Sequence, residues 1–376
     1  MPVDPKIALI SSGLGRVRRG IETWIGELAR NLAPRVDVEL WGASRLEGWP
    51  CPTLPIPTIS RLSWIVRPAS WGARYHIEQM SAVLPSILRL RRRRIDLAFC
   101  GDPSLAWNLK RFRRFHGAKV VFSDGMRLSP RWLQDYDGIH LLAPRYLEEA
   151  AMVVRPERLS RFFVVPYFVE LDRFRPPVPG EKQSIRAEFG IPNDAMVALT
   201  VGPVGRVSGK RLDHVIREVA AAGPGWRLVS AGGDEDGAGA VREEARRTLG
   251  DRVQFLGAIP RARLESLYRA ADCYILGALA EPFSIAILEA IASGLPVVHH
   301  PDPITCWVSG EGGMPVSMET GGAGAGALQR LALEPGLGAR MGLAGRELAC
   351  RRNDPGRVTE ALAERFRAIC GTGSRA

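Results

Sequence analysis

Short apolar runs alternate with longer amphipathic stretches along most of the chain of 376 residues. Many of these runs are rich in valine, isoleucine and leucine, and turn-forming residues bracket them. The runs that we expect to form strands are residues 7–10, 36–41, 97–99, 119–122, 138–142, 196–201, 227–230, 253–256, 273–276 and 296–298. Repeated alternation of strand and helix predicts an α/β fold, in which helices cover both faces of parallel sheets.

One polar, proline-rich stretch interrupts this alternation near the middle of the chain. Residues 172–182 include Pro176, Pro177 and Pro179, and the strand and helix pattern starts again after them. A chain of this length exceeds one ordinary hydrophobic core, so either two domains or one large domain is expected. We predict two Rossmann-like domains, residues 1–175 and 176–357, that face each other across a cleft. A helix over about residues 358–376 can pack back on the first domain.

The composition excludes several classes of protein. Hydrophobic residues make up 46% of the chain and charged residues 24%, which is typical of a globular protein. No apolar run approaches the roughly 20 residues of a membrane span, and residues 7–10 are too short for the core of a signal peptide. The six cysteines are scattered, without a Cys-x-x-Cys pair or a histidine at ligand spacing. We therefore expect reduced thiols, no metal site and a cytoplasmic location.

Positive charge is concentrated in the first half of the sequence. Residues 1–180 contain 28 lysines and arginines against 17 acidic residues, a net of +11, whereas residues 181–376 contain 23 of each. Tryptophan, tyrosine and arginine are interleaved over residues 61–94, which end in four arginines, and a second basic cluster occupies residues 110–114. This mixture predicts peripheral contact with the anionic inner face of a membrane. The alternative is a solvated arginine-rich face; nucleic acid is not expected, because no binding motif accompanies the charge.

Two glutamates lie near each other in the C-terminal third of the sequence. Glu281 precedes an apolar run that we expect to be a buried helix, and Glu289 lies inside that run, where carboxylates are seldom found without a partner. In a continuous helix their spacing would separate them by roughly 12 Å along the axis. Such a pair can hold both ends of an elongated ligand, while the amides of the helix N-terminus attract an anionic group. A loop Glu281 and a solvent-facing Glu289 are the simpler alternative.

Two glycine-rich loops follow predicted strands. The first, residues 13–20, has the spacing Gly-x-Gly-x-x-x-x-Gly and lacks the third glycine of the dinucleotide-binding fingerprint. A nicotinamide cofactor is therefore not expected, although amides near Gly20 can approach a phosphate. The second loop, residues 202–211, carries Arg206, Lys210 and Arg211, which suit a diphosphate unless the loop is merely solvated. Together with the two glutamates, these cations predict a nucleoside diphosphate sugar as ligand.

Several short motifs resemble one family of enzymes in their order and spacing. The motifs are Asp172-Arg-Phe-Arg-Pro, Gly205-Arg with Lys210, Phe255-Leu-Gly257, Leu267-Tyr-Arg-Ala-Ala-Asp272, and the segment from Glu281-Pro-Phe to Val298. Together they resemble the retaining glycosyltransferases of the GT-B fold that use nucleotide sugars, the glycosyl transferases group 1 (family four) class. The resemblance covers nearly the whole chain, is strong over residues 165–300 and is looser in the first half.

This resemblance implies roles for particular residues. Glu281 would hold hydroxyls of the donor sugar, while Arg206 and Lys210 would neutralise the leaving diphosphate; these three are the implied catalytic residues. The implied donor-binding residues are Gly20, Gly205, Gly257, Phe283, Ser284, Ile285 and Glu289. Glu289 would hold the ribose. The resemblance also implies a retaining, metal-independent hexosyltransferase without a cofactor, which acts on a glycan or lipid-linked acceptor in cell-envelope or exopolysaccharide synthesis.

The sequence departs from the family pattern at several places, one of which is Pro166-Tyr-Phe-Val-Glu170 in place of the usual Pro-Asn-Gly-Val-Asp. Ser284 replaces the usual glycine after Glu-Pro-Phe, and Arg19-Gly20 replaces the usual pair of glycines. The histidine that often ends a strand of the first domain has no clear match; Ser123 and Asp124 fall there, and we assign both to the acceptor side. These departures leave two alternatives open. One is a sugar-nucleotide-binding protein of the same fold with weak catalysis, and the other is a nucleotide-sugar epimerase, whose histidine and carboxylate pattern is not visible.

Overall fold

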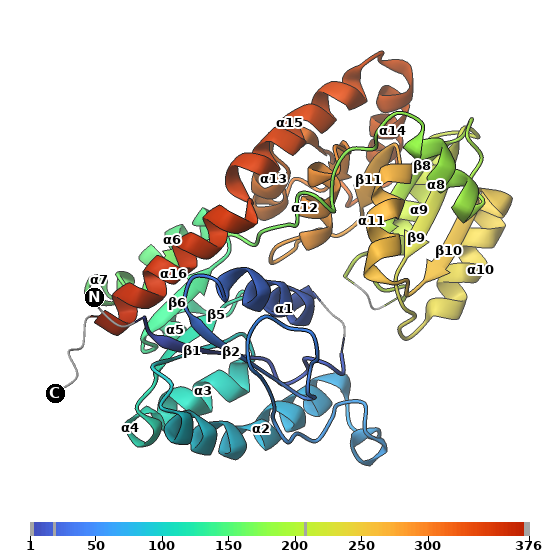
Figure 1. Cartoon of the computed structure of the whole chain (residues 1–376). Coiled ribbons are helices and arrows are strands. Elements are labelled where there is room, and N and C mark those ends of the chain that lie inside the picture. Colours follow the sequence, from blue (N-terminus) through green and yellow to red (C-terminus); the bar gives the residue numbers. More distant parts are fainter. Residues whose placement is uncertain (1–3, 18–19, 207–208, 372–376) are drawn as a thin grey trace. The chain divides into compact units, whose positions relative to one another are not determined.

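Two compact units make up the chain in a computed structural model that describes residues 4–17, 20–206 and 209–371. The first unit consists of Met1–Tyr167 and Pro355–Ala376, and the second of Phe168–Asp354 (Figure 1). Each unit contains one sheet in which all paired strands are parallel. The predicted α/β architecture, with two Rossmann-like sheets, is therefore confirmed.

The first unit is built on a seven-stranded sheet with the order β3-β2-β1-β4-β5-β6-β7. Its strands are β1 (Lys6–Ile10), β2 (Asp37–Gly42), β3 (Thr53–Pro55), β4 (Leu97–Cys100), β5 (Lys119–Ser123), β6 (Gly138–Leu141) and β7 (Phe162–Val164). Its helices are α1 (Gly20–Leu32), η1 (Trp64–Val66), α2 (Trp71–Arg93), α3 (Pro103–Arg111), α4 (Arg113–His116), α5 (Pro130–Leu133), α6 (Pro144–Ala151), α7 (Pro156–Leu159) and α16 (Pro355–Gly371). In Figure 1, α1 and α16 lie on one face of this sheet, and α2, α3 and α4 lie on the other.

An aromatic cluster joins the elements of the first unit. Trp24 of α1 stacks on His140 of β6, with ring centroids 5.9 Å apart. Phe99 of β4 contacts Phe366 of α16, with centroids at 5.4 Å, and both side chains are fully buried. Because large aromatic side chains contribute heavily to a core, α16 is an integral part of this unit although 187 residues of the second unit precede it in the sequence.

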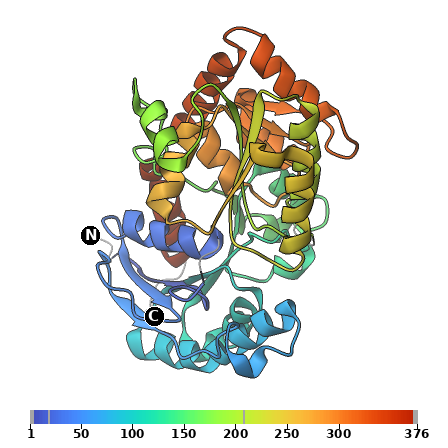
Figure 2. The ribbon, with the colours of Figure 1, turned by 90° about the vertical axis from the view of Figure 1, so that its right-hand side faces the viewer.

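The second unit is built on a six-stranded sheet with the order β10-β9-β8-β11-β12-β13. Its strands are β8 (Met196–Val201), β9 (Trp226–Ala231), β10 (Val253–Gly257), β11 (Cys273–Leu276), β12 (Val297–His299) and β13 (Gly313–Pro315). Its helices are α8 (Glu181–Phe189), α9 (Leu212–Ala221), α10 (Ala238–Leu249), η2 (Gly250–Arg252), α11 (Arg261–Ala270), α12 (Ile285–Ala292), α13 (Pro303–Ser309), η3 (Gly310–Gly312), α14 (Ala323–Leu333) and α15 (Leu337–Arg352). Figure 2 shows helices on both sides of these strands.

The strands of both sheets read as continuous apolar runs because helices cover both faces. Residues of β4 and β11 are buried at every position. Three strands that the sequence analysis did not predict, β3, β7 and β13, are each three residues long. Runs of that length do not give a periodic pattern. The equally short β12 was expected because two consecutive valines follow a Gly-Leu-Pro turn.

Candidate functional site

The strand order of the second sheet reverses between β8 and β11. From β8 the chain continues outward through β9 and β10, and from β11 it continues in the opposite direction through β12 and β13. In open α/β sheets, ligands bind beyond the carboxyl ends of the strands at such a switch point. The loops that follow β8 and β11 are therefore the place to look for a site, and they contain Lys210 and Glu281.

The loop after β8 is held by backbone hydrogen bonds to the loop after β9. The amide of Val204 donates to the carbonyl of Gly233 at 2.9 Å, and the amide of Arg206 donates to the carbonyl of Asp236 at 3.2 Å. Gly205 lies in this close approach, because an added Cβ would be 3.0 Å from the carbonyl oxygen of Asp236. The Arg206 side chain is exposed at the edge of the loop.

Lys210 and Glu281 meet at the switch point, although 71 positions separate them in the sequence. The Lys210 Nζ lies 2.6 Å from the Glu281 Oε1, and both side chains are largely buried. Gly277, which follows β11, permits this approach: an added Cβ would be 3.0 Å from the Lys210 carbonyl oxygen and 2.8 Å from that of Arg211. The structure thus brings together two of the three residues with implied catalytic roles.

Arg211 makes different contacts from Arg206 and Lys210, the other two cations of its loop. Its guanidinium donates to the carbonyl oxygens of Gly277 and Met318, and its backbone is left-handed with a φ of 50°. Nearby, burial raises the pKa of the Tyr274 hydroxyl, and the charge of Glu281 raises it further. The hydroxyl stays protonated and donates to the carbonyl of Val201 at 3.4 Å. This bond links β11 to the end of β8.

Ser284 is the N-cap of α12. Its hydroxyl accepts a hydrogen bond from the Ile287 amide at 3.4 Å, and the side chain is buried. N-capping serine satisfies an amide that would otherwise lack a partner in the first turn. Phe283 is also buried and contacts Trp307 edge to face, with ring centroids 6.3 Å apart. The first helical residue is Ile285, so Glu281 lies four positions before the helix and the helical spacing considered for the two glutamates does not apply.

Glu289 is buried on α12 with only 2% of its surface exposed. One carboxylate oxygen accepts from the Arg261 guanidinium, and the other accepts from the Tyr268 hydroxyl at 2.8 Å. Burial raises the pKa of Tyr268, and the adjacent Glu289 raises it further, so the hydroxyl remains a donor. The simpler alternative of a solvent-facing Glu289 is therefore wrong. Its carboxylate is fixed by α11 before any ligand arrives.

Gly257 ends β10 with a φ of 66°, a conformation that favours glycine. Its carbonyl oxygen accepts from the Gly232 amide at 2.9 Å, which ties this strand end to that of β9. Phe255, earlier in β10, carries the guanidinium of Arg242 over its ring at 4.5 Å. The family resemblance implies that Gly257 binds the donor, and the structure places it two strands from the strand that precedes Lys210.

The remaining site residues lie in the first unit. Gly20 is the first residue of α1 and is exposed; Arg19, which precedes it, lies outside the described residues. Ser123 ends β5 and is buried, and its hydroxyl is 2.8 Å from His140 Nδ1. The other ring nitrogen of His140 is 2.6 Å from the Val165 carbonyl oxygen. The Ser123 hydroxyl is therefore in contact with a buried histidine of the core.

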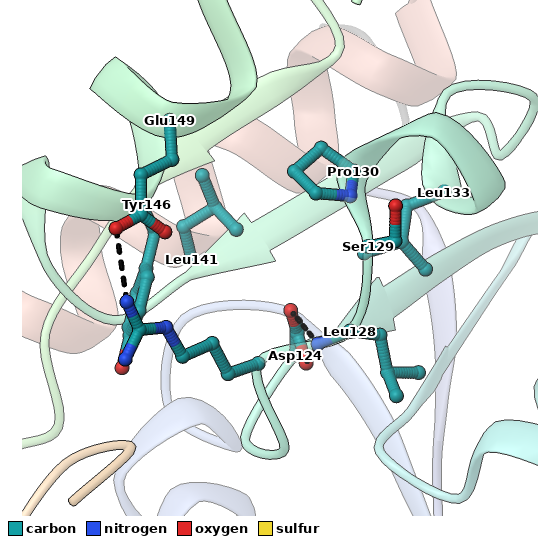
Figure 3. Close-up of a pocket in the computed structure, with 9 residues that line it drawn as sticks. Asp124, Leu128, Ser129, Pro130, Leu133, Leu141, Tyr146 and Glu149 are labelled. Carbon is teal, nitrogen blue, oxygen red and sulfur yellow. Dashed lines mark hydrogen bonds and ion pairs between the residues drawn. The ribbon is translucent and has the colours of Figure 1, made fainter. Parts of the chain in front are cut away.

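Asp124 lines a pocket of about 140 Å³ beyond the carboxyl ends of β5 and β6 (Figure 3). The lining residues are Asp124, Arg127, Leu128, Ser129, Pro130, Leu133, Leu141, Tyr146 and Glu149. The Asp124 carboxylate accepts hydrogen bonds from the amides of Met126 at 3.1 Å and Leu128 at 3.0 Å. Burial raises the pKa of Asp124, and these amide bonds oppose the rise.

Arg127 is held across this pocket in a left-handed backbone conformation, with a φ of 58°. Its guanidinium donates to Glu149 Oε1 at 3.0 Å and lies 5.8 Å from the centre of the Tyr146 ring. A left-handed non-glycine residue is uncommon and costs free energy, so the surrounding bonds must enforce it. The amide bonds to Asp124 on either side of Arg127 do this.

Sequence reasoning missed the residues that support the site. Arg261 and Tyr268 bind Glu289, Gly277 admits the Lys210 loop, and Arg127 pairs with Glu149 in the pocket. Only Tyr268 lay within a motif that had been singled out. The other contacts join residues from different elements, and no spacing rule would have revealed them.

The described residues contain neither a cluster of metal ligands nor a helix suited to span a membrane. No group of three or more histidine, cysteine, aspartate or glutamate side chains is arranged to hold a metal ion in the described part of the chain. Among the described helices, none is both long enough and apolar enough to cross a membrane.

Part of the second unit matches a known protein family. Residues 181–327 match the model of the family described as glycosyl transferases group 1. A D-inositol 3-phosphate glycosyltransferase of Mycolicibacterium smegmatis (strain ATCC 700084 / mc(2)155) is 34% identical over 171 residues, which are 44% of this chain and 36% of that protein. One from Mycobacterium tuberculosis (strain F11) is 33% identical over 168 residues, 43% of this chain and 32% of that protein. The matching segment thus spans about a third of the length of these relatives.

Solved structures resemble the chain over nearly its whole length. A sucrose-phosphate synthase from Thermosynechococcus elongatus has a TM-score of 0.82 at 21% identity and covers 98% of this chain and 100% of its own. HepE from Anabaena, in complex with UDP and glucose, has a TM-score of 0.75 at 16% identity, with coverages of 97% and 100%. At these identities the likeness concerns the fold. The chain has the GT-B fold, and its residues 181–327 match the family described as glycosyl transferases group 1.

Proposed function

We propose that this protein transfers a sugar from a nucleoside diphosphate sugar to an acceptor hydroxyl. The observation that carries this proposal is the meeting of Lys210 and Glu281, 2.6 Å apart, at the switch point of the second sheet. The matching family model covers both residues. The names of the relatives, D-inositol 3-phosphate glycosyltransferases, and the UDP and UDP-glucose in the HepE structures support a nucleotide sugar as donor.

The two ends of the donor would meet different groups of this site. Lys210 and Arg206 supply positive charge for the diphosphate, and the amides at the start of α12 supply hydrogen-bond donors. Glu281 can accept from sugar hydroxyls through the carboxylate oxygen that does not face Lys210. Glu289 is oriented by Arg261 and Tyr268, and a carboxylate fixed in this way can accept from ribose hydroxyls without losing conformational freedom.

The proposed reaction retains the anomeric configuration and uses no metal. The bond between the anomeric carbon and the diphosphate oxygen breaks, and the acceptor oxygen forms a new bond to that carbon on the same face. The acceptor proton passes to an oxygen of the leaving diphosphate. Departure of the diphosphate builds up negative charge, which Lys210 and Arg206 would stabilise without a protein nucleophile.

The acceptor would bind to the first unit. The pocket at Asp124 is the described cavity nearest to the residues assigned to the acceptor side, and it offers Ser129, Tyr146 and Glu149 as further polar groups. We propose a glycan or a lipid-linked acceptor, used in cell-envelope or exopolysaccharide synthesis. Replacing Asp124 by alanine should raise the KM for acceptor while leaving the slow hydrolysis of donor unchanged. Equal loss of both activities would place Asp124 outside acceptor binding.

A panel of UDP-, GDP- and dTDP-sugars tests the donor. A bound donor raises the melting temperature by mass action, and release of nucleoside diphosphate reports turnover. Release should be lost in Glu281→Ala, and the exposed Glu243→Ala on α10 serves as a matched control. Donor binding without release under any acceptor would identify a binding protein, and recovery of an epimerised donor would identify an epimerase. An inverted glycosidic product would refute retention.

A further inference from the structure

The excess positive charge of the chain lies mostly in one segment of the first unit. Residues 61–114 contain twelve lysines and arginines and only three acidic residues. Two of the acids, Glu78 and Asp102, are buried, and Asp96 accepts from the Lys6 amide. Exposed basic side chains in this segment include Arg67, Arg91, Arg92, Arg94, Arg111, Arg113 and Arg114. The solvent-facing side of the segment is therefore strongly cationic.

One face of α2 is apolar although it is exposed. Met80, Leu84 and Leu88 follow one another at intervals of four residues, with exposed fractions of 41%, 64% and 51%. At about 100° per residue they form a stripe within an arc of roughly 80°, and Arg91 continues it. The adjoining side of the helix carries Val83, Ile87 and Leu90, which are buried in the core. This helix is therefore apolar on a side that the fold does not cover.

The stripe is flanked by exposed aromatic and aliphatic residues. Before α2, Leu62, Trp64 and Ile65 are 62%, 81% and 64% exposed. On the other flank α3 and α4 pack against α2 (Figure 1) and expose Trp107 and Phe115. Arginines accompany the rings: Arg91 lies 4.5 Å over Phe115, and Arg111 lies 5.6 Å from the centre of Trp107.

We propose that these residues form a docking surface for an anionic lipid bilayer, here called the α2 face. It comprises Leu62, Trp64, Ile65, Met80, Leu84, Leu88, Trp107 and Phe115 with Arg91, Arg92, Arg111 and Arg114. Apolar side chains enter the interfacial region while arginines bind lipid phosphates, which is how amphipathic basic helices lie on membranes. The shortage of exposed acids argues against a second copy of this chain as occupant, because two α2 faces would repel each other.

The structure also corrects part of the sequence interpretation of this face. Arg61 was grouped with the basic and aromatic residues, but it is 2% exposed and pairs with Glu78 at 2.6 Å. Tyr75 turns its hydroxyl toward Asp102, at 2.8 Å. These two side chains therefore anchor the segment to the first unit. Met80, Leu84 and Leu88, which the sequence did not single out together, supply the apolar contact.

The orientation of α2 relates the α2 face to the pocket at Asp124. In a parallel α/β sheet the connecting helices run antiparallel to the strands, so η1 and the start of α2 lie at the carboxyl edge of the first sheet. The pocket at Asp124 opens beyond the ends of β5 and β6, at that same edge. From there α2 extends for roughly 35 Å along the unit. A lipid-linked acceptor would therefore enter the pocket at this edge, and this statement rests on the proposed function. The docking of the α2 face to a bilayer rests on the surface itself.

Vesicle flotation with the full chain tests the proposal without any sugar nucleotide. The protein should float with vesicles of phosphatidylcholine and 30% phosphatidylglycerol, and not with pure phosphatidylcholine. Binding should weaken as salt rises, because screening reduces the attraction of exposed charges. Arg92→Gln with Arg114→Gln should weaken partition about thirtyfold at low salt. Leu84→Ser with Leu88→Ser should weaken it at every salt concentration.

Matched controls separate this surface from general charge or hydrophobicity. Arg246→Gln with Arg247→Gln on α10, and Leu343→Ser on α15, change exposed residues of the second unit and should leave flotation unchanged. Donor binding by thermal shift should be unchanged in every variant, so a failure of docking is distinct from a failure of the proposed transfer. Absence of flotation at low salt overturns the proposal. So does flotation that the α2-face variants leave intact, or a dimer in solution that Leu84→Ser with Leu88→Ser dissociates.

Discussion

Replacing Lys210 by methionine tests whether this lysine acts on the reaction or only holds Glu281. Methionine keeps an unbranched side chain but removes the charge that faces Glu281 Oε1 at 2.6 Å. The side chains of the pair are 26% and 11% exposed, so solvent screens part of the attraction. We expect the loss to cost about 1–2 kcal/mol, between the values for an exposed ion pair and for a buried unpaired charge. For a unit of this size that lowers the melting temperature by about 2–8 °C.

The expected effect on the reaction is much larger than the effect on stability. A charged group that stabilises the departing diphosphate contributes about 10²–10³ in kcat, by analogy with the loss of one preorganised donor. Nucleoside diphosphate release should therefore fall by that factor at 25 °C, where the folded state still predominates. Lys210→Arg, which keeps the charge, should recover part of the rate.

A double-mutant cycle with Glu281→Gln distinguishes the two roles of Lys210. If the lysine acts directly on the leaving group, Lys210→Met slows release further in the Glu281→Gln background. Steady-state release and thermal unfolding are measured for all four proteins, so that rate and stability are compared in the same samples. A loss of less than about threefold, or a loss that disappears in the Glu281→Gln background, would refute a direct role for Lys210.

Three further predictions follow from contacts of buried groups. Tyr268→Phe removes the hydrogen bond to Glu289 and should lower the free energy of unfolding in urea by about 1.5–3 kcal/mol; an unchanged value would show that Glu289 does not depend on it. Burial lowers the pKa of His140 to about 4 from its ordinary 6.5, so the unfolded chain takes up this proton more readily as pH falls through that window. Stability should therefore fall by about 2 kcal/mol between pH 7 and pH 5 through this group, and His140→Asn should lose less over the same range in urea titrations. Gly277→Ala should displace the adjacent carbonyls of the Lys210 loop and weaken donor binding in thermal-shift assays, whereas Gly209→Ala, where an added Cβ meets nothing, should not.

The fold was predictable from the sequence wherever a strand was long enough to produce an apolar run. Ten such strands were expected and the structure contains a strand at each of these places. Helices cover both faces of each sheet, so the strands are continuously apolar. This apolar pattern was strong even where strands are four residues long, as in β4 and β11. The strands β3, β7 and β13 are three residues long, as is β12, but within their bounds they lack the consecutive valines that marked β12. They are recognised only by pairing with a neighbouring strand.

Individual residues of the candidate site were predictable from the sequence, but most of the contacts between them were not. Glu281 and Lys210 were each conspicuous for charge next to a strand end, and the parallel topology brings them together. The partners of Glu289 were not predictable, because Arg261 and Tyr268 sit on α11 with no sign of their orientation in the sequence. The same holds for Arg127, whose left-handed backbone is set by hydrogen bonds to Asp124.

The return of α16 to the first unit has a consequence for how the protein is made. Residues 168–354 form the second unit without interruption, so its core can close as soon as that stretch has left the ribosome. The first unit begins earlier but lacks Leu362 and Phe366, both fully buried, until the last helix has been synthesised. Through most of synthesis the aromatic groups around Phe99 therefore have no cover from α16. The half of the chain that is translated first is completed last, and it is this half that a nascent-chain chaperone would have to protect.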